Sequence, residues 1–431
     1  MNRYQTYKPS GIEWMGEIPE LWKVKRVKDL TSKIGSGVTP SGGAEVYSDN
    51  GIPFFRSQNI YNNKLSIDDI VFISEEIDNS MSNSRIRPND ILLNITGASI
   101  GRCFYAPINF KKGNVNQHVC IIRPIQKKII TNFLHFQIIS QYGQSLIEIS
   151  QNGANREGLN FQQIKNFVFG IPSFQEQTTI ANYLDTKTTA IDRKIELLTA
   201  KSDKYKALRR SLINETVCRG LNPDATLKDS GIEWIGMIPK HWEVKRFKEI
   251  ANTIKGRNLD FFDTYFEKSL PNLSLEYLRN ESVIFETYCY TTDRTQKATT
   301  NDMIIIWDGA GVGEILKGKE GFLSSTIAKI VINQKKYDPN FFYHLRFSVE
   351  YILKMIPAGM GIPHLNPQVL NSFDCPCPPL NEQIEIGRYL DEKTTQIDTI
   401  LSNIGEQINK LTQLRKTLIN DVVTGKIKVT E

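Results

Sequence analysis

The sequence predicts a mixed α/β (α+β) protein built as two tandem units, each a globular region followed by a long helix. The first observation is a repeat: residues 172–217 and 378–423 both read Pro-x-x-x-Glu-Gln, then Tyr-Leu-Asp and Ile-Asp, at a shift of 206 positions. The second is that residues 10–30 and 230–250 agree at thirteen of 21 positions. Two copies of about 200 residues indicate a tandem duplication rather than a solenoid of short repeats.

Both helical segments carry hydrophobic heptads. Apolar residues recur every seven positions in each segment: Leu184, Ile191, Leu198, Tyr205 and Leu212 in the first, and Leu390, Ile397, Ile404, Leu411 and Leu418 in the second. A soluble helix can bury such a stripe only against another helix. A helix of about 40 residues is roughly 60 Å long, at about 1.5 Å per residue. Two such helices predict a spacer that holds other parts of the chain apart.

Composition restricts the class of protein. A chain of 431 residues with 40% hydrophobic and 23% charged residues is typical of a globular protein of about two to four domains. The sequence has no apolar run of membrane-spanning length and no signal-peptide pattern, so we expect a cytoplasmic protein. The six cysteines lack a CxxC pair, which favours reduced thiols. The net charge of +6 permits a polyanionic partner without requiring one.

The repeated segment that precedes each globular region has the pattern Gly-Ile-Glu-Trp-x-Gly-x-Ile-Pro-x-x-Trp. We expect its tryptophans (Trp14 and Trp22, Trp234 and Trp242) to be core residues that anchor each unit, followed by a strand at residues 24–27. The alternative is that these rings stack on nucleic-acid bases.

The globular regions, about 31–168 and 251–374, read as mixed α/β. We expect strands at residues 91–95, 119–122, 303–307 and 326–332, and helices near 131–149 and 339–355. Residues 89–101 align with residues 301–313, whereas the surrounding loops differ. One scaffold with two different sets of loops predicts two related but distinct ligands.

Two glycine-containing segments resemble catalytic motifs. Residues 303–313 end an apolar strand in Asp308 and Gly-x-Gly-x-Gly, as in a loop that binds S-adenosylmethionine. The residues after Gly313 form a poor helix, and the matching segment of the first unit lacks the acidic residue, so a turn is favoured. Ser99 fits Gly-x-Ser-x-Gly, but Gly311 replaces it in the second unit. Neither histidine spacing for a metal site nor a phosphate-binding P-loop is present.

Exposed polar loops are the remaining candidates, and they point to DNA. Their side chains can hydrogen-bond to phosphate oxygens or to base edges. The candidates in the first unit are Ser36, Thr39, Ser41, Arg56, Ser57, Gln58, Asn59, Asn116 and Gln117. Those in the second unit are Lys255, Arg257, Asn258, Arg294, Gln296 and Lys297. For each loop alone, a solvated surface without function is the competing interpretation.

The two repeats, each present twice and in the same order, closely resemble the specificity subunits of Type I restriction-modification systems. The resemblance covers essentially the whole chain. It implies that the globular regions are target recognition domains that each read one half of a split DNA sequence. It also implies that the two helices pack as an antiparallel coiled coil that fixes the distance between the halves, in a pseudo-two-fold arrangement.

The resemblance implies four parts: recognition domain 1 (1–170), a central helix (171–220), recognition domain 2 (221–376) and a C-terminal helix (377–431). The implied partners are double-stranded DNA, two modification (methyltransferase) subunits and two restriction (endonuclease and translocase) subunits, without a membrane. No catalytic site, metal or cofactor is expected in this chain, because S-adenosylmethionine, ATP and Mg²⁺ belong to the partner subunits.

Two alternatives remain open from the sequence. One is a methyltransferase that uses the loop at residues 308–313. The other is a coiled-coil adaptor without catalytic or DNA-reading function.

Overall fold

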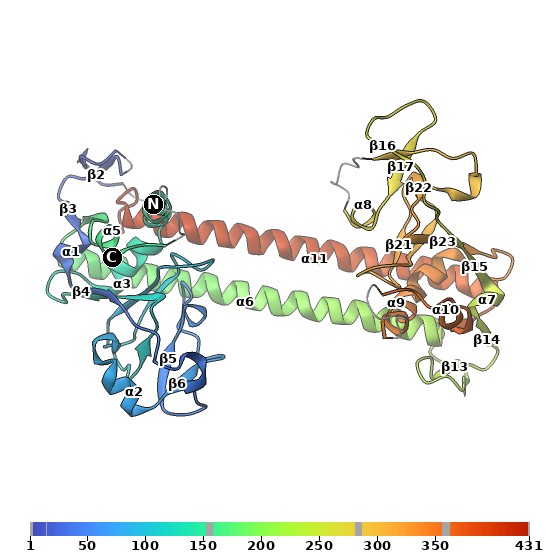
Figure 1. The fold of residues 1–431 in the computed structure, drawn as a ribbon, viewed down its shortest axis with the longest axis horizontal. Helices are drawn as coiled ribbons and strands as arrows, with labels where there is room; N and C mark the ends of the chain where they lie inside the picture. Colours follow the sequence, from blue (N-terminus) through green and yellow to red (C-terminus); the bar gives the residue numbers. More distant parts are fainter. Residues whose placement is uncertain (1–2, 14, 152–157, 281–286, 356–362, 430–431) are drawn as a thin grey trace. The chain divides into compact units, whose positions relative to one another are not determined.

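The computed structural model describes residues 3–13, 15–151, 158–280, 287–355 and 363–429. The chain forms two compact units, Met1–Thr199 with Gly405–Glu431, and Ala200–Ile404. Two long helices, α6 (Phe174–Arg219) and α11 (Leu380–Val423), each contribute one part to both units (Figure 1). The predicted long helices are therefore confirmed.

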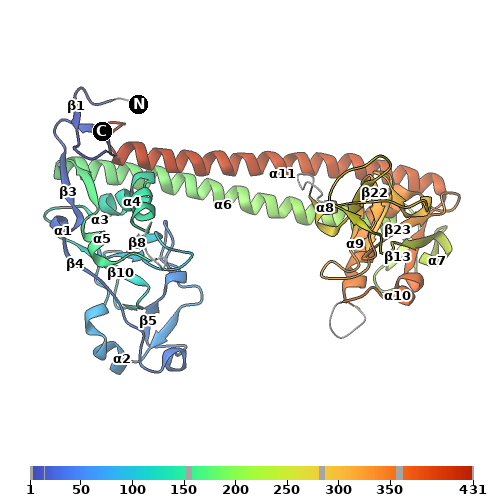
Figure 2. The ribbon, with the colours of Figure 1, turned by 45° about the horizontal axis from the view of Figure 1, so that its top comes forward.

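A four-stranded antiparallel sheet organises the first unit, in the order β4 (Thr31–Ser36), β10 (Val119–Pro124), β7 (Ile91–Asn94) and β8 (Cys103–Tyr105). Helices α3 (Thr131–Ile139) and α4 (Gln141–Gln151) lie between this sheet and the long helices (Figure 2). Side chains of β7 alternate between two cores: Ile91 and Leu93 pack in the helix-covered core, and Leu92 packs in the second. This period of two is why residues 91–93 of the strand are all apolar.

The second unit repeats this design, with the order β15 (Ala251–Lys255), β23 (Ile327–Ile332), β20 (Met303–Ile306) and β21 (Ile315–Lys317). Helix α9 (Pro339–Met355) covers it in place of α3 and α4. The predicted strands and the helix predicted near 339–355 are confirmed, with ends that differ by a few residues. The helical segment predicted near 131–149 is present as two helices, α3 and α4, separated at Ser140.

Further sheets and short helices complete each unit. In the first unit they are β1 (Tyr7–Pro9) with β2 (Glu17–Pro19), β3 (Lys23–Arg26) with β11 (Val168–Ile171), and β5 (Ile52–Phe55) with β6 (Val71–Ile73) and β9 (Asn114–Val115), together with α1 (Val27–Leu30), α2 (Glu75–Ser80) and α5 (Phe161–Lys165). In the second they are β12 (Leu227–Asp229) with β13 (Met237–Pro239), β14 (Glu243–Arg246) with β24 (Asp374–Cys377), and a sheet of β16 (Phe261–Phe262), β18 (Tyr288–Cys289), β17 (Leu270–Leu273), β22 (Gly321–Leu323) and β19 (Lys297–Ala298), together with α7 (Phe247–Ile250), α8 (Leu275–Arg279) and α10 (Pro367–Ser372).

The repeated Glu-Gln pair anchors each long helix to its globular region. Trp22 Nε1 donates to Glu176 Oε1 at 3.3 Å, and Trp242 Nε1 donates to Glu382 Oε2 at 2.9 Å. Both tryptophans are at most 1% exposed, so their assignment to the core is confirmed. Trp234 is half-buried, and Trp14 lies outside the described residues.

The glutamine of the same pair binds backbone. Gln383 Oε1 accepts from Asp338 N at 2.7 Å, and its Nε2 donates to Pro378 O at 2.8 Å. Gln177 makes the equivalent bonds in the first unit, to Ile130 N at 2.9 Å and to Pro172 O at 3.2 Å. Because both amides are buried, each satisfies polar groups that water cannot reach.

The two long helices pack antiparallel inside each unit. Asp192 on α6 forms an ion pair with Arg415 on α11 at 2.9 Å in the first unit. Arg209 on α6 pairs with Asp398 on α11 at 3.1 Å in the second. Moving forward along α6 therefore means moving backward along α11 by the same number of residues. The heptad residues that the sequence predicts are all buried or half-buried, as an antiparallel coiled coil requires. None of the helices in the described residues meets the length and hydropathy of a membrane span.

Substituting the buried glutamines should destabilise one unit at a time. Gln383→Ala leaves Asp338 N and other buried groups without partners, which costs about 1–3 kcal/mol of unfolding free energy. Urea unfolding followed by circular dichroism, with hydrogen exchange to locate the loss, should show it in the second unit, and Gln177→Ala should show it in the first. Gln396→Ala, an exposed glutamine of α11 that bonds only Glu392 among the described residues, is the control and should change stability little. Equal effects of Gln396→Ala and Gln383→Ala would contradict the anchoring role.

His135 should make the first unit sensitive to acid. Its ring is 2% exposed; burial, and secondarily the charge of Arg415, lowers its pKa from 6.5 to about 3. Between about pH 6.5 and 3, His135 is protonated in the unfolded chain but not in the folded chain. The free energy of unfolding therefore falls by about 1.4 kcal/mol for each unit by which the pH is lowered. Urea titrations at pH 7, 6 and 5 should show a shallower decline for His135→Phe than for the unsubstituted chain. Parallel declines would refute this role.

Candidate nucleic-acid interface

One edge of the four-stranded sheet gathers the polar loops in each unit. In the first unit, β4 and β7 end where β10 begins, because both run antiparallel to it: Ser36 pairs with Cys120, and Asn94 pairs with Val119. In the second unit, Lys255 pairs with Ala328 and Ile306 pairs with Ile327 in the same way. We call this end of each sheet the polar edge.

Three separate segments, residues 55–57, 94–95 and 116–118, meet at the polar edge of the first unit. Asn116 N donates to Phe55 O at 3.2 Å. Asn94 Nδ2 donates to Ser57 O at 2.8 Å. Ile95 N donates to His118 O at 3.0 Å. The structure therefore brings together the candidate loops at residues 56–58 and 116–117, which are distant in sequence.

A glycine follows the first strand of each sheet because another backbone approaches it closely. A Cβ at Gly37 would lie 1.7 Å from Val115 O, and a Cβ at Gly256 would lie 2.0 Å from Ser324 O. No side chain fits at either position. The close contact fixes where Ser36 and Lys255, the preceding residues, enter the polar edge.

The polar edge of the second unit carries most of the predicted basic residues. Arg257 forms an ion pair with Asp293 at 3.2 Å, and Lys255 forms one with Asp308 at 3.2 Å. Hydrogen bonds from Thr295, and also the charge of Arg257, lower the pKa of Asp293. Gln296 Nε2 donates to Lys255 O at 3.4 Å. The structure thus joins the segments at residues 255–258 and 293–297.

Three predicted contact residues are buried, which corrects the sequence-based site. Asn59 is 0% exposed; its Oδ1 accepts from Arg56 N and its Nδ2 donates to Asp68 O. Gln296 is 1% exposed, and Asn116, at 8%, accepts from His118 N. Their amides hydrogen-bond to backbone groups and shape the loops, and almost none of their surface is exposed in this structure. Polar type alone predicted them as contacts, whereas burial decides their role.

The other predicted residues remain accessible. Arg56 and Ser57 are half-buried, and Arg56 also donates to Asp69 O at 2.9 Å. Ser36 is half-buried, and Lys297 pairs with Glu320 at 2.7 Å. The exposed members are Thr39, Ser41, Gln58, Gln117, Lys255, Arg257, Asn258, Arg294 and Lys297.

Two side-chain pairs at the polar edges escaped the sequence analysis. Thr96 Oγ1 lies 2.6 Å from His118 Nδ1 in the first unit. Asp308 Oδ1 lies 2.7 Å from His364 Nδ1 in the second. The alignment of residues 89–101 with 301–313 places Thr96 and Asp308 at equivalent positions. This equivalence is the feature of the sequence that could have pointed to both pairs.

The glycines after Asp308 belong to a hairpin. Gly313 N donates to Ile306 O at 2.9 Å, and β20 then pairs antiparallel with β21. A cofactor loop of the methyltransferase type would lead into a helix, so this interpretation of residues 308–313 is wrong. Groups of three or more His, Cys, Asp or Glu residues that could hold a metal ion do not occur in the part of the chain that the structure describes.

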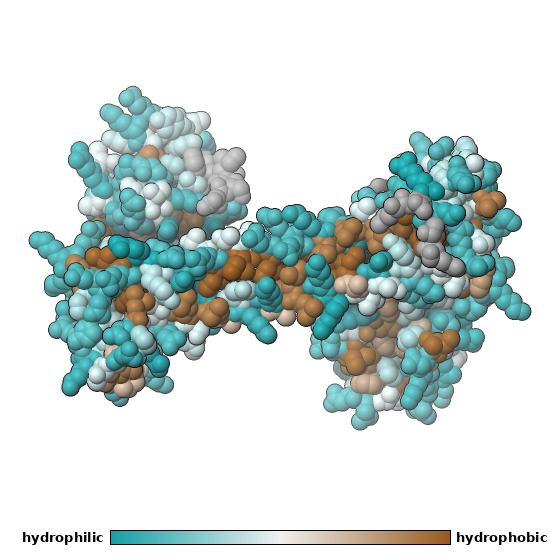
Figure 3. Space-filling view, turned by 180° about the vertical axis from the view of Figure 1, so that it is seen from behind, coloured by the Kyte–Doolittle hydropathy of each residue, from teal (hydrophilic) through white to brown (hydrophobic). Residues whose placement is uncertain are grey.

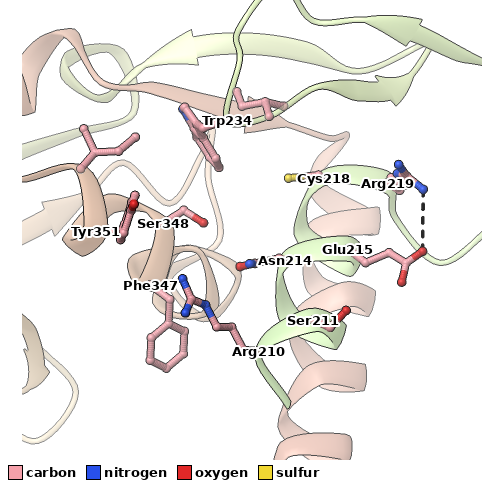
Figure 4. Close-up of a pocket in the computed structure, with 12 residues that line it drawn as sticks. Arg210, Ser211, Asn214, Glu215, Cys218, Arg219, Trp234, Phe347, Ser348 and Tyr351 are labelled. Carbon is pink, nitrogen blue, oxygen red and sulfur yellow. Dashed lines mark ion pairs between the residues drawn. The ribbon is translucent and has the colours of Figure 1, made fainter. Parts of the chain in front are cut away.

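The long helices offer a second kind of surface. Hydrophobic side chains gather along them (Figure 3), and Leu197, Leu208 and Leu414 are each more than half exposed. A groove of about 600 Å³ in the second unit lies between the last turns of α6 and helix α9 (Figure 4). Arg210, Asn214, Trp234 and Tyr351 line it, and Arg219 pairs with Glu215 at its side, at 3.8 Å.

Comparison with known proteins gives a consistent result. The chain matches the family "Type I restriction modification DNA specificity domain" twice, at residues 19–204 and 239–410. It is 33% identical over 189 residues to the Type I restriction enzyme MjaVIII specificity subunit of Methanocaldococcus jannaschii. This matched stretch covers 43% of this chain and 43% of the relative. It is 23% identical to the MjaIX specificity subunit of the same organism, over 97% of this chain and 96% of the relative.

The fold is also found among solved structures. A chain from a study of complex assembly and conformational transition of the type I R-M system superposes with a TM-score of 0.73. The superposition covers 95% of this chain and 99% of the other, at 16% identity.

Proposed function

Because the chain belongs to the Type I restriction modification DNA specificity family, we propose that it recognises DNA for a Type I restriction-modification complex. Each globular unit reads one half of a bipartite target. The observation that carries this proposal is the pair of polar edges: two copies of one sheet present different side chains at equivalent positions. A split target with two different halves needs such a pair of readers.

The long helices set the number of unread base pairs between the halves. Helices α6 and α11 have 46 and 44 residues, and each runs through both units without interruption. A helix pair keeps its length far better than a flexible linker does. Half-site separation is a geometric property of this kind of reader.

Partner subunits supply the chemistry. We propose that two modification subunits dock on the exposed apolar faces of the helices and on the groove beside α9, and that two restriction subunits complete the complex. S-adenosylmethionine, ATP and Mg²⁺ then bind the partners, and this chain remains non-catalytic. The complex acts in the cytoplasm, where its DNA target is accessible.

The direct test is methylome sequencing of a host that carries this gene and its modification partner. We expect one methylated motif with two specified halves separated by unspecified bases. A contiguous motif, or methylation that does not depend on this gene, would refute the proposal. Titration of S-adenosylmethionine into the isolated chain should show no binding.

Lengthening both helices by one heptad should lengthen the spacer alone. Seven residues add about 10 Å of helix, which corresponds to about three base pairs at roughly 3.4 Å each. The insertions duplicate residues 198–204 in α6 and 404–410 in α11, which keeps the hydrophobic stripe in register. Methylome sequencing should return the same half-sites with a longer spacer. An unchanged spacer would contradict the role of the helices.

Removing one exposed arginine from the polar edge should reduce the salt dependence of DNA binding. Arg257 has a side chain that is 68% exposed, and a phosphate contact by it contributes about one to the slope of log K against log salt. The Arg257→Ala complex with its modification partner should lose about that much slope in a fluorescence-anisotropy titration. Lys228→Ala, which changes an exposed lysine of β12, is the control, and equal slopes for the two variants would exclude the contact.

A further inference from the structure

The polar edge of the second unit holds one histidine in a fixed orientation. His364 Nδ1 lies 2.7 Å from Asp308 Oδ1, and the other carboxylate oxygen of Asp308 lies 3.2 Å from Lys255 Nζ. Backbone bonds on both sides hold the segment: Gly309 N donates to Pro363 O at 2.9 Å, and Leu365 N donates to Trp307 O at 2.8 Å. The histidine is thus fixed through its backbone and through one ring nitrogen.

The exposure of the His364 side chain indicates that this cluster does not serve mainly to stabilise the fold. The His364 side chain is 56% exposed, whereas Asp308 is only 18% exposed. A surface ion pair contributes at most about 1 kcal/mol to stability, so the cluster adds little to the fold. Its result is an oriented imidazole at the surface, and residues restrained in this way provide precise recognition.

The charges around Asp308 are compatible with DNA. An unpaired carboxylate at this position would repel the phosphate backbone. Here both oxygens are engaged, one by the ammonium of Lys255 and one by the imidazole. Lys255 also lies 5.5 Å from the centre of the Trp307 ring, a cation–π contact that restrains it. The negative charge of Asp308 is therefore balanced mainly by Lys255 and His364 and repels the DNA backbone less.

The first unit fills the same place with a different segment. Thr96 follows β7, and Asp308 follows β20. Each forms an isolated antiparallel backbone bridge, Thr96 with Gly158 and Asp308 with His364. Where His364 would be, the first unit has a glycine, and its imidazole comes from His118, which precedes β10. His118 Nε2 lies 2.9 Å from Gln117 Nε2, so in this unit the ring positions an exposed amide.

We propose that His364 is a base-reading residue of the second unit, positioned by Asp308 and Lys255. This inference rests on the proposed function. Nδ1 of His364 faces the Asp308 carboxylate as the donor of that contact, which leaves Nε2 of an uncharged ring as a hydrogen-bond acceptor. Hydrogen bonds to this Nε2 are not formed within the described residues. In the major groove, amine donors belong to adenine and cytosine, so His364 selects one of these bases at one position.

The test is the base preference of the complex with its modification partner, measured by methylation of DNA libraries randomised in each half-site. His364→Ala should lower the preference for one base at one position of the second half-site by about tenfold, the scale of a lost base contact. Asp308→Asn should weaken the preference at the same position. The first half-site and the spacer should stay unchanged, which shows that the complex is assembled.

A matched control comes from the same unit. His241 is an exposed histidine whose Nε2 lies 2.6 Å from Glu382 Oε1, away from the polar edge. His241→Ala should leave every position of the motif unchanged. His364→Gln repeats the test with a smaller change of side chain, in case alanine lowers the melting temperature.

An unchanged second half-site in both His364→Ala and His364→Gln would overturn the inference. So would an equal loss of preference at all positions of that half-site, because this indicates a structural role. Failure of the proposed function looks different: the unsubstituted complex itself would show no bipartite motif.

Discussion

Each globular core is closed by the beginning of one long helix and the end of the other. In the first unit, Ile180 and Leu184 of α6 are buried in the same core as Leu418 and Val422 of α11. In the second, Ile213 and Val217 of α6 share a core with Ile386 and Leu390 of α11. Neither core is complete without both helices, so their antiparallel pairing is a condition for folding.

The anchored helix start explains why the sequence keeps Glu-Gln in both copies. The glutamate fixes a tryptophan of the preceding repeat, and the glutamine satisfies the backbone before α3 or α9. Both interactions bring together residues more than 40 positions apart. The frame can then hold its geometry while the loops at the polar edge change. Divergent recognition on a constant scaffold needs this separation between residues that fold and residues that bind.

The sequence predicted the frame well because its signals are local and repeated. The heptads, the β-rich runs and the paired motifs each occupy one continuous stretch of sequence, and every one of them occurs twice. The binding side chains were harder to predict. Asn59 and Arg56 are equally polar in the sequence, but Asn59 turns inward to bind Asp68 O. The contact of Asp308 with His364 joins segments 56 residues apart, and only the folded sheet brings them together.

The two polar edges differ by coupled changes. Ser36 pairs with the second residue of β10, and Lys255 pairs with the second residue of β23. Thr96 lies two residues after the end of β7, and Asp308 lies two residues after the end of β20. Where the first unit has two hydroxyls, the second has a lysine and an aspartate that form an ion pair. An aspartate alone would repel DNA, and a lysine alone would attract any sequence without discrimination. As a pair they leave the formal charge of these two positions unchanged and give the edge a new hydrogen-bonding pattern. The two units have therefore diverged in what they read without a change in the charge that these positions present to DNA.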